Sequence, residues 1–399
     1  MRLLVALTLA MAAAAGAAGG VGPPATVLGP QRVLVVPVRL PDVTPSRSTP
    51  AIAEKVRRVA EWVEAASYGK ATLDVTMLGW QPLSRPLAEY RVSPHNYYVD
   101  RERVRRLVED ALSAAARQAR FEDAACVYIV VGAQTEPGQG YGMIAYAANP
   151  GMLTGVRQAR ARHEVLRLAD GREFSGAVIV SADNAHPGHV AHDLLHALGG
   201  AREGRRAVPD LYDYDLQSNP PRGVRMHPEL FAIHAGPWDI MSQHFIARDQ
   251  PPPPPSSFTR LQLGWIGAEQ VVTVRPGETR EIVLEPLESG RGPLVVKIPV
   301  ERQRYFLLEN RQPLGLATVL PASGLLVLEI DETRPEGSDI VKVVDANPAV
   351  RGLAGAPFTP GSGPGNVYVN ARDGFAVRPL SVAAGQIRLQ VTTPDRVTR

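Results

Sequence analysis

The pattern of apolar and polar positions divides the chain into two parts of different character. In the first part, apolar runs rich in valine alternate with stretches whose apolar residues recur every three or four positions. The runs predict strands, and the three-to-four spacing predicts amphipathic helices. We expect strands at 31–42, 71–83, 125–133 and 176–184, and helices at 52–63 and 101–119. Strands that alternate with helices in this order predict an α/β layer.

Beyond Trp265 the pattern changes to short apolar strands separated by Gly, Pro, Asp and Asn, without helical periodicity. Such a series predicts a β-sandwich. The five prolines at 251–255 predict a stiff surface loop before it, because proline breaks regular structure. The expected fold is therefore an α/β (α+β) domain over residues 21–268, followed by an all-β, sandwich-like domain over 269–399.

The N-terminus has the pattern of an export signal. One arginine is followed by an apolar run from Leu3 to Ala15 and then by small residues. This run is shorter than the roughly 18 residues of a membrane span and suits a signal peptide over residues 1–20. The alternative is a retained hydrophobic helix. No later run approaches the length of a span, so we expect a secreted, extracytoplasmic chain without stable membrane insertion.

Composition and charge narrow the classes of function. The net charge is +3, and the arginines are scattered among acids rather than gathered beside aromatic residues, so nucleic-acid binding is not expected. The single cysteine, Cys126, lies in an apolar run and cannot form an internal disulfide. Its burial also argues against a thiol protease, and no G-x-S-x-G or Walker motif occurs. No pattern in the sequence indicates an oligomeric state.

The stretch HVAHDLLHALGG, residues 189–200, carries the strongest candidate chemistry. His192 and His196 are four residues apart, so on a helix both rings reach one ion, with Zn–N distances of about 2.0–2.1 Å. Asp193 follows the first histidine, where a carboxylate can act on water at the metal. Gly199 permits a sharp turn back toward the site. The alternative is a pair of structural histidines on an amphipathic helix.

The surrounding motifs resemble those of the M6 metallopeptidases, the immune inhibitor A-like family. The similar segments run in order along the chain: EAASYGKATLDV, GHVAHDLLHALGG, VPDLYDYD, GPWDIMSQHF, SSFTRLQLGWI, YFLLENRQ, LPASGLLVLEID and PFTPGSG. The resemblance implies a metzincin-like zinc protease acting on protein or peptide substrates. It also implies that His192, His196 and Asp210 are the zinc ligands and that Met241 lies in a Met-turn, in a packing role.

The chain departs from the family pattern at the general base, where Asp193 replaces glutamate. Aspartate has the same carboxylate but one carbon–carbon bond less reach, about 1.5 Å. General acid–base catalysis contributes roughly 10²–10⁴-fold, so the shorter side chain predicts a weakened base. We therefore expect a zinc endopeptidase that hydrolyses peptide bonds through a zinc-activated water. The alternatives are a zinc-retaining pseudoprotease that serves as a binding or scaffold protein, and an exported carbohydrate-binding protein without tightly bound zinc.

A second departure is the apparent insertion GAREGRRA at 200–207, which precedes the expected third ligand. If the insertion forms its own loop, Asp210 reaches the metal; otherwise Glu203 or no residue fills the third position. We expect Asp210, a motif helix packed under the sheet, and no ligand from the β domain.

Further candidate groups flank the motif. His186 and His189 precede it and could belong to a second metal site or to the substrate cleft, although solvent-facing or N-cap-adjacent positions are the simpler interpretation. Asp213 and Asp215 could hold calcium or could only shape a turn.

Overall fold

The computed structural model describes residues 26–90, 101–121, 123–134, 145–148, 165–174, 176–202, 205–214, 234–362 and 365–397. The expected signal peptide, residues 1–20, lies outside this part of the chain. Within it, no helix is both long and apolar enough to cross a membrane.

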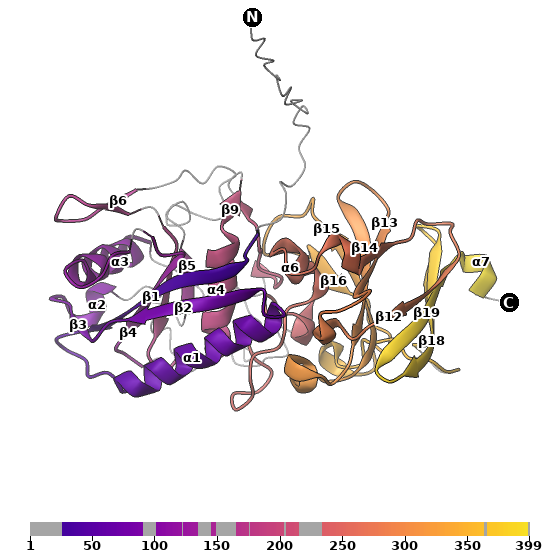
Figure 1. The fold of residues 1–399 in the computed structure, drawn as a ribbon, viewed down its shortest axis with the longest axis horizontal. Helices are drawn as coiled ribbons and strands as arrows, with labels where there is room; N and C mark the ends of the chain where they lie inside the picture. Colours follow the sequence, from indigo (N-terminus) through magenta and orange to yellow (C-terminus); the bar gives the residue numbers. More distant parts are fainter. Residues whose placement is uncertain are drawn as a thin grey trace, which may run out of the picture.

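In the first half, six of the described strands form a mostly parallel sheet (Figure 1). Its order is β2 (Ala71–Met77), β1 (Gly29–Arg39), β4 (Cys126–Val131), β8 (Val178–Ala182) and β5 (Ala145–Ala148), with β3 (Gln81–Pro82) also on β1. Only β5 runs antiparallel to its neighbour. The strands expected at 31–42, 125–133 and 176–184 are confirmed. The strand expected at 71–83 is divided into β2 and β3, and β5 is an addition.

Both faces of the central strands are buried, which explains their unbroken apolar sequence. Along β1, Val33 and Val35 join one hydrophobic cluster, whereas Leu34 and Val36 join another on the opposite face. Helices α1 (Thr49–Ala66) and α4 (Pro187–Gly199) contribute to the first cluster, and α3 (Arg101–Ala115) contributes to the second. The two helices expected from periodicity, α1 and α3, are thus confirmed, and they cover opposite faces of the sheet.

In the second half, two further sheets face each other, as the strand pattern predicts. One has the order β11 (Val271–Thr273), β13 (Val295–Pro299), β14 (Arg304–Arg311), β15 (Gly324–Asp331), β16 (Val341–Val343). The other has the order β12 (Arg280–Leu284), β19 (Gln386–Thr392), β18 (Phe375–Ala383), β17 (Tyr368–Asn370). Side chains from both sheets form one hydrophobic cluster, as in a sandwich. The molecule is therefore of mixed α/β class.

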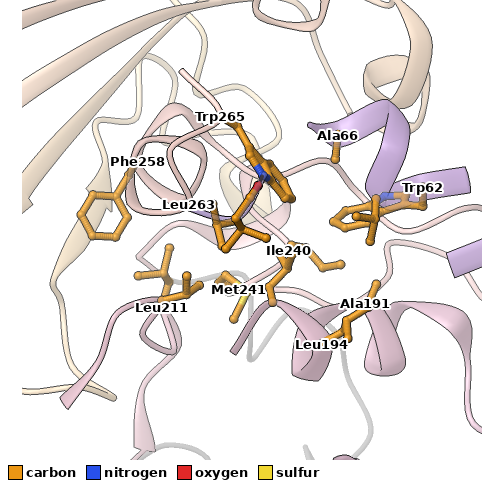
Figure 2. Close-up of a cluster of buried hydrophobic side chains, with 14 of the residues drawn as sticks. Trp62, Ala66, Ala191, Leu194, Leu211, Ile240, Met241, Phe258, Leu263 and Trp265 are labelled. Atoms are coloured by element: carbon orange, nitrogen blue, oxygen red, sulfur yellow. Dashed lines mark hydrogen bonds between the residues drawn. The ribbon is translucent and has the colours of Figure 1, made fainter. Parts of the chain in front are cut away.

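Strand β14 is buried on both faces and joins the two halves of the molecule. Phe306 and Leu308 point into the cluster between the two β sheets, whereas Tyr305 and Leu307 belong to the cluster that contains α1 and α4. Residues before and after position 268 therefore share one hydrophobic core. Figure 2 shows part of it, with Trp265 lying above Ile240 and Met241.

The proline run at 251–255 departs from the sequence expectation. It has no regular structure, as predicted, but Pro252 to Pro255 are buried rather than on the surface. Proline lacks a backbone N–H, so this segment can be buried without leaving donors unpaired. Two of its carbonyls accept hydrogen bonds, Pro252 from Trp62 Nε1 at 3.2 Å and Pro255 from Arg311 Nη2 at 3.3 Å.

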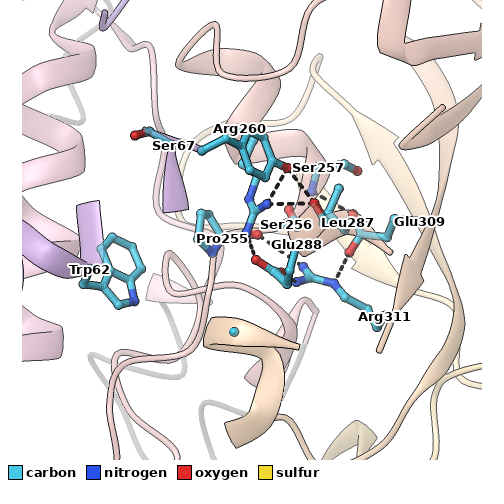
Figure 3. Close-up of polar contacts among 12 residues, drawn as sticks. Trp62, Ser67, Pro255, Ser256, Ser257, Arg260, Leu287, Glu288, Glu309 and Arg311 are labelled. Atoms are coloured by element: carbon cyan, nitrogen blue, oxygen red, sulfur yellow. Dashed lines mark hydrogen bonds and ion pairs between the residues drawn. The ribbon is translucent and has the colours of Figure 1, made fainter. Parts of the chain in front are cut away.

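A buried ionic network lies at the junction of the two halves (Figure 3). Glu288 accepts hydrogen bonds from Arg260, on helix α6 (Ser257–Gln262), and from Arg311 Nη1 at 3.0 Å. Arg311 Nε also donates to Glu309 at 2.7 Å, and Glu309 accepts the Ser257 N–H at 2.7 Å. Both arginines are fully buried. The network explains why these charged residues tolerate a position inside the core.

Arg311→Met should destabilise the protein strongly, because it leaves Glu288 and Glu309 as buried, poorly compensated charges. We expect a loss of about 3–5 kcal/mol in the free energy of unfolding, measured by urea denaturation. The matched control is Arg388→Met, which breaks an exposed ion pair with Glu281 and should cost at most about 1 kcal/mol. Equal losses in the two variants would contradict this role of Arg311.

Candidate metal centre

Helix α4 carries the motif histidines, and its first turn is built by local signals. His186 is the N-cap, and its Nδ1 accepts the Gly188 N–H at 3.0 Å. Pro187 occupies the first helical position, where a missing N–H costs nothing. His186, which the sequence places on the surface or next to the N-cap, is thus the N-cap itself.

The end of α4 returns the chain toward the motif. Gly200 adopts the left-handed region, with φ of 69°, which favours glycine. Gly199 has a different role from the one expected: a Cβ at this position would lie 2.7 Å from the Val208 side chain, so glycine allows close packing. Together the two glycines let the segment after the helix return against it.

Three polar side chains converge at a buried point beside α4. His192 Nε2 lies 3.0 Å from Asp210 Oδ1, His196 Nε2 lies 3.0 Å from the same oxygen, and the two Nε2 atoms are 3.0 Å apart. None of the three residues is more than 3% exposed. The structure thus brings together the residues that the sequence proposes as metal ligands. Two overlapping groups here could hold a metal ion, one made of His192, Asp193 and His196 and the other of His196, Asp210 and Glu336.

Backbone carbonyls fix the orientation of both imidazole rings. His192 Nδ1 lies 3.0 Å from the carbonyl oxygen of Ile240, and His196 Nδ1 lies 2.7 Å from that of Val208. A carbonyl only accepts, so each Nδ1 carries the proton, and in the neutral ring Nε2 presents a lone pair. Metal-binding histidines are oriented in this way by a hydrogen bond to the other ring nitrogen.

The two histidines differ in their electrostatics. Burial lowers the pKa of His196 to about 3, and the Arg206 charge acts in the same direction, so this ring is neutral. Burial also opposes a charge on His192, but the hydrogen bond and negative charge of Asp210 raise the pKa of His192 above its ordinary value. A cation bound at Nε2 would displace that proton.

Asp193 lies beside the cluster without joining its hydrogen bonds. One of its carboxylate oxygens is within 4.8 Å of a ligand atom of both His192 and His196. It is 6% exposed, and among the described residues its Oδ2 has no hydrogen-bond partner. Burial raises the pKa of this carboxyl to about 7. The side chain therefore presents an unsatisfied buried acceptor next to the candidate ligands.

The expected insertion forms a small hairpin of its own. Strands β9 (Ala201–Arg202) and β10 (Arg205–Arg206) pair antiparallel, and the Ala207 N–H donates to the Gly200 carbonyl at 2.9 Å. The chain after the hairpin then brings Asp210 back to the histidines. Glu203, the alternative third ligand, lies outside the described residues.

The sequence did not predict the role of Arg206 at the end of this hairpin. Its Nη1 lies 2.9 Å from His196 Nε2, 2.9 Å from Asp210 Oδ2 and 3.3 Å from Glu336 Oε1. Tyr214 also donates to Asp210 Oδ2, at 2.6 Å. The tyrosine stands in the motif VPDLYDYD, but nothing in the local sequence marks Arg206 as part of the site.

The β half contacts the site, although the expectation that it supplies no metal ligand stays a prediction. Glu336, between β15 and β16, accepts the Asp210 N–H at 3.1 Å and forms a second possible ligand group with His196 and Asp210. Burial raises the pKa of this carboxyl to about 7, although Arg206 opposes the shift. Since 126 residues separate Asp210 and Glu336, no local pattern could reveal this contact.

Met241 lies in a buried turn that is directly linked to the histidines. The preceding residue, Ile240, supplies the carbonyl that orients His192, and the Met241 carbonyl accepts the Leu211 N–H at 2.9 Å. Asp239 holds the turn by accepting the Met241 N–H at 2.8 Å. Met241 is fully buried and lies between Leu211 and Ile240 in Figure 2. Its surroundings fit a packing role.

The remaining candidate groups lie at the edges of the site. His186 and His189 line a hollow of about 430 Å³ at the start of α4, together with Lys55 and Phe245. Neither histidine belongs to a possible ligand group among the described residues. Asp213 Oδ2 lies 3.4 Å from His234 Nε2, whereas Asp215 lies outside the described part, so calcium binding stays a prediction.

Comparison with known proteins gives no match for this chain. No protein-family model matches the chain, and no curated protein matches it. The resemblance to the M6 metallopeptidases therefore rests on the sequence motifs alone.

Removing both motif histidines should abolish metal binding. We expect His192→Ala combined with His196→Ala to lose the bound metal after dialysis, measured as metal per chain by mass spectrometry, because only Asp210 of the three converging ligands remains. The control is His234→Asn, which removes a histidine outside the possible ligand groups and suits the left-handed φ of 58° at that position. Metal content that is equal in the double variant and the control would exclude this site.

Proposed function

We propose that the chain is a secreted zinc-dependent endopeptidase, with His192, His196 and Asp210 as ligands and Asp193 as a weakened general base. The observation that carries the proposal is the convergence of two Nε2 atoms and one carboxylate oxygen at mutual distances of 3.0 Å. In the neutral rings these are three acceptors facing one point, an arrangement that favours a cation. The cleavage of peptides and the export of the chain are inferred from the motif resemblance and the N-terminal pattern.

The residues present fit zinc better than calcium or magnesium. Two imidazoles and one carboxylate are ligands that zinc prefers, whereas the other two ions prefer oxygen. A tetrahedral zinc ion with bonds of about 2.0–2.1 Å holds its ligand atoms about 3.3–3.4 Å apart, close to the 3.0 Å spacing here. Three protein ligands also leave one position open, as in catalytic zinc sites. When bound, the zinc would polarise the scissile carbonyl and make water acidic near neutral pH.

Residues of the chain would orient the ligands and transfer the proton. The carbonyls of Ile240 and Val208 hold the rings, and Tyr214 holds the second oxygen of Asp210. Asp193 Oδ2 is the free acceptor that could take a proton from water and pass it to the leaving amine. The side chain is one methylene shorter than glutamate, so we expect proton transfer over a longer or less favourable path.

A second candidate function is a zinc-retaining pseudoprotease that acts as a binding or scaffold protein. The observation that favours it is Asp193 at the general-base position, because its side chain is one methylene shorter than that of glutamate. Both functions require the metal, whereas a carbohydrate-binding protein would not hold it tightly. Metal analysis therefore distinguishes the carbohydrate-binding protein from the other two candidates. A cleavage assay distinguishes the endopeptidase from the pseudoprotease.

Variants of Asp193 test the catalytic proposal. Asp193→Asn should lower casein cleavage roughly 10²–10⁴-fold, because an amide cannot accept the proton, whereas Asp193→Glu should keep or raise it. Activity is measured with and without a chelator, and zinc content is measured in parallel. The control is Asp74→Asn, which neutralises an exposed aspartate on β2 and should leave cleavage unchanged.

The outcomes separate the two candidates. If the native chain shows no chelator-sensitive cleavage but Asp193→Glu gains it, the chain is a pseudoprotease that lacks only the reach of its base. If Asp193→Asn cleaves as fast as the native chain with equal zinc content, Asp193 is not the base.

A further inference from the structure

Arg206 holds an unusual position for a cation, because it lies against the ligands of a proposed metal. Its side chain is 8% exposed, and its Nη1 approaches both His196 Nε2 and Asp210 Oδ2 at 2.9 Å. The adjacent residue, Arg205, is on the same strand but exposed. The two arginines of β10 thus have opposite environments, and only one of them reaches the cluster.

The hydrogen bonds around His196 show what the Arg206 contact does. Nδ1 of His196 must carry a proton, since its neighbour at 2.7 Å is the carbonyl oxygen of Val208. Arginine has donors only, so the group at Nε2 must accept. The guanidinium therefore donates into the same lone pair that a metal ion would take. The contact and the metal bond cannot exist together.

We propose that Arg206 is an internal competitor of the metal, a guanidinium that occupies the ligand cluster and must leave His196 before an ion can bind. This inference rests on the proposed metal centre but does not depend on turnover. The positive charge adds to the effect, because a divalent cation would enter beside a guanidinium in a buried, weakly screened site.

The surroundings of Arg206 make its contact with His196 reversible. Nη1 has two hydrogens but three acceptors within 3.3 Å: His196 Nε2, Asp210 Oδ2 and Glu336 Oε1. When it leaves His196, both hydrogens still have carboxylate partners. In addition, the Nε–H of Arg206 is buried and has no partner among the described residues. A small movement toward Glu336 thus loses little hydrogen bonding.

The opposite role for Arg206 is to support the metal by orienting Asp210. Outer hydrogen-bond partners of ligands typically raise metal affinity 10–100-fold, so removing a supporting arginine would weaken binding. Removing a competitor would strengthen it. The sign of the change in zinc affinity therefore decides between the two roles.

The first experiment compares zinc affinity in Arg206→Ala and Arg205→Ala, by competition with a chromophoric chelator. The two variants remove the same charge from neighbouring positions of one strand. We expect Arg206→Ala to bind zinc about tenfold more tightly or better, since a charge-assisted hydrogen bond no longer competes. Arg205→Ala should match the native chain. Weaker or equal binding in Arg206→Ala overturns the proposal.

The second experiment restores the competitor as a free ion. Guanidinium chloride at low millimolar concentration, far below denaturing levels, should fill the space left in Arg206→Ala and weaken its zinc binding in proportion to concentration. Sodium chloride at equal ionic strength is the control, and the native chain should not respond. If guanidinium acts no differently from sodium, the effect of Arg206 is only its general charge, and the proposal fails.

A third variant covers the case in which Arg206→Ala does not fold. Arg206→Lys keeps the charge, but its nitrogen falls one bond short of Nη1, so it should also bind zinc more tightly than Arg205→Lys. Equal binding in the two lysine variants overturns the proposal. If neither the native chain nor any folded variant binds zinc, the metal centre itself is wrong. If all bind it equally, only the role of Arg206 is wrong.

Discussion

The arrangement of the site depends on Arg311, a buried arginine more than a hundred residues away from the motif helix in sequence. Its guanidinium pairs with Glu288 and Glu309, and its Nη2 donates to the carbonyl of Trp238 at 3.0 Å. Trp238 lies two residues before Ile240, whose carbonyl orients His192. An ionic network at the junction of the two halves thus fixes the segment on which a candidate ligand depends. Removing one partner from such a buried ionic network is strongly destabilising, because it leaves an uncompensated buried charge.

The candidate metal centre is therefore built by both halves of the chain rather than by one helix. Helix α4 supplies the two imidazoles, the segment after the hairpin supplies Asp210 and the Val208 carbonyl, and the turn at Met241 supplies the Ile240 carbonyl. The β half contributes Glu336 to the site and Arg311 to its support. The double burial of β14 explains this cooperation, because a strand with two apolar faces must be covered from both sides.

Local periodicity could predict most of the elements and the histidine pair, because spacing along a strand or helix determines which side chains share a face. It could not predict the burial of Pro252 to Pro255, since composition marks the segment as irregular but does not show that its missing N–H groups suit the interior. The sequence also could not predict that Arg206 and Glu336 lie at the site. Their contacts depend on how the hairpin and the second half of the chain fold back onto α4. No local repeat or motif in the sequence indicates these long-range contacts.

The shared core has a consequence for the order of events during synthesis. A chain that emerges from its N-terminus exposes His192 and His196 long before Glu309, Arg311 and Glu336 are made. Until the β half folds, the first half lacks the cover of β14, and the segment that orients His192 lacks its ionic support. Large chains commonly pass through such partly packed intermediates. The cluster of candidate ligands is therefore completed only at the end of folding, once the last sheets are in place.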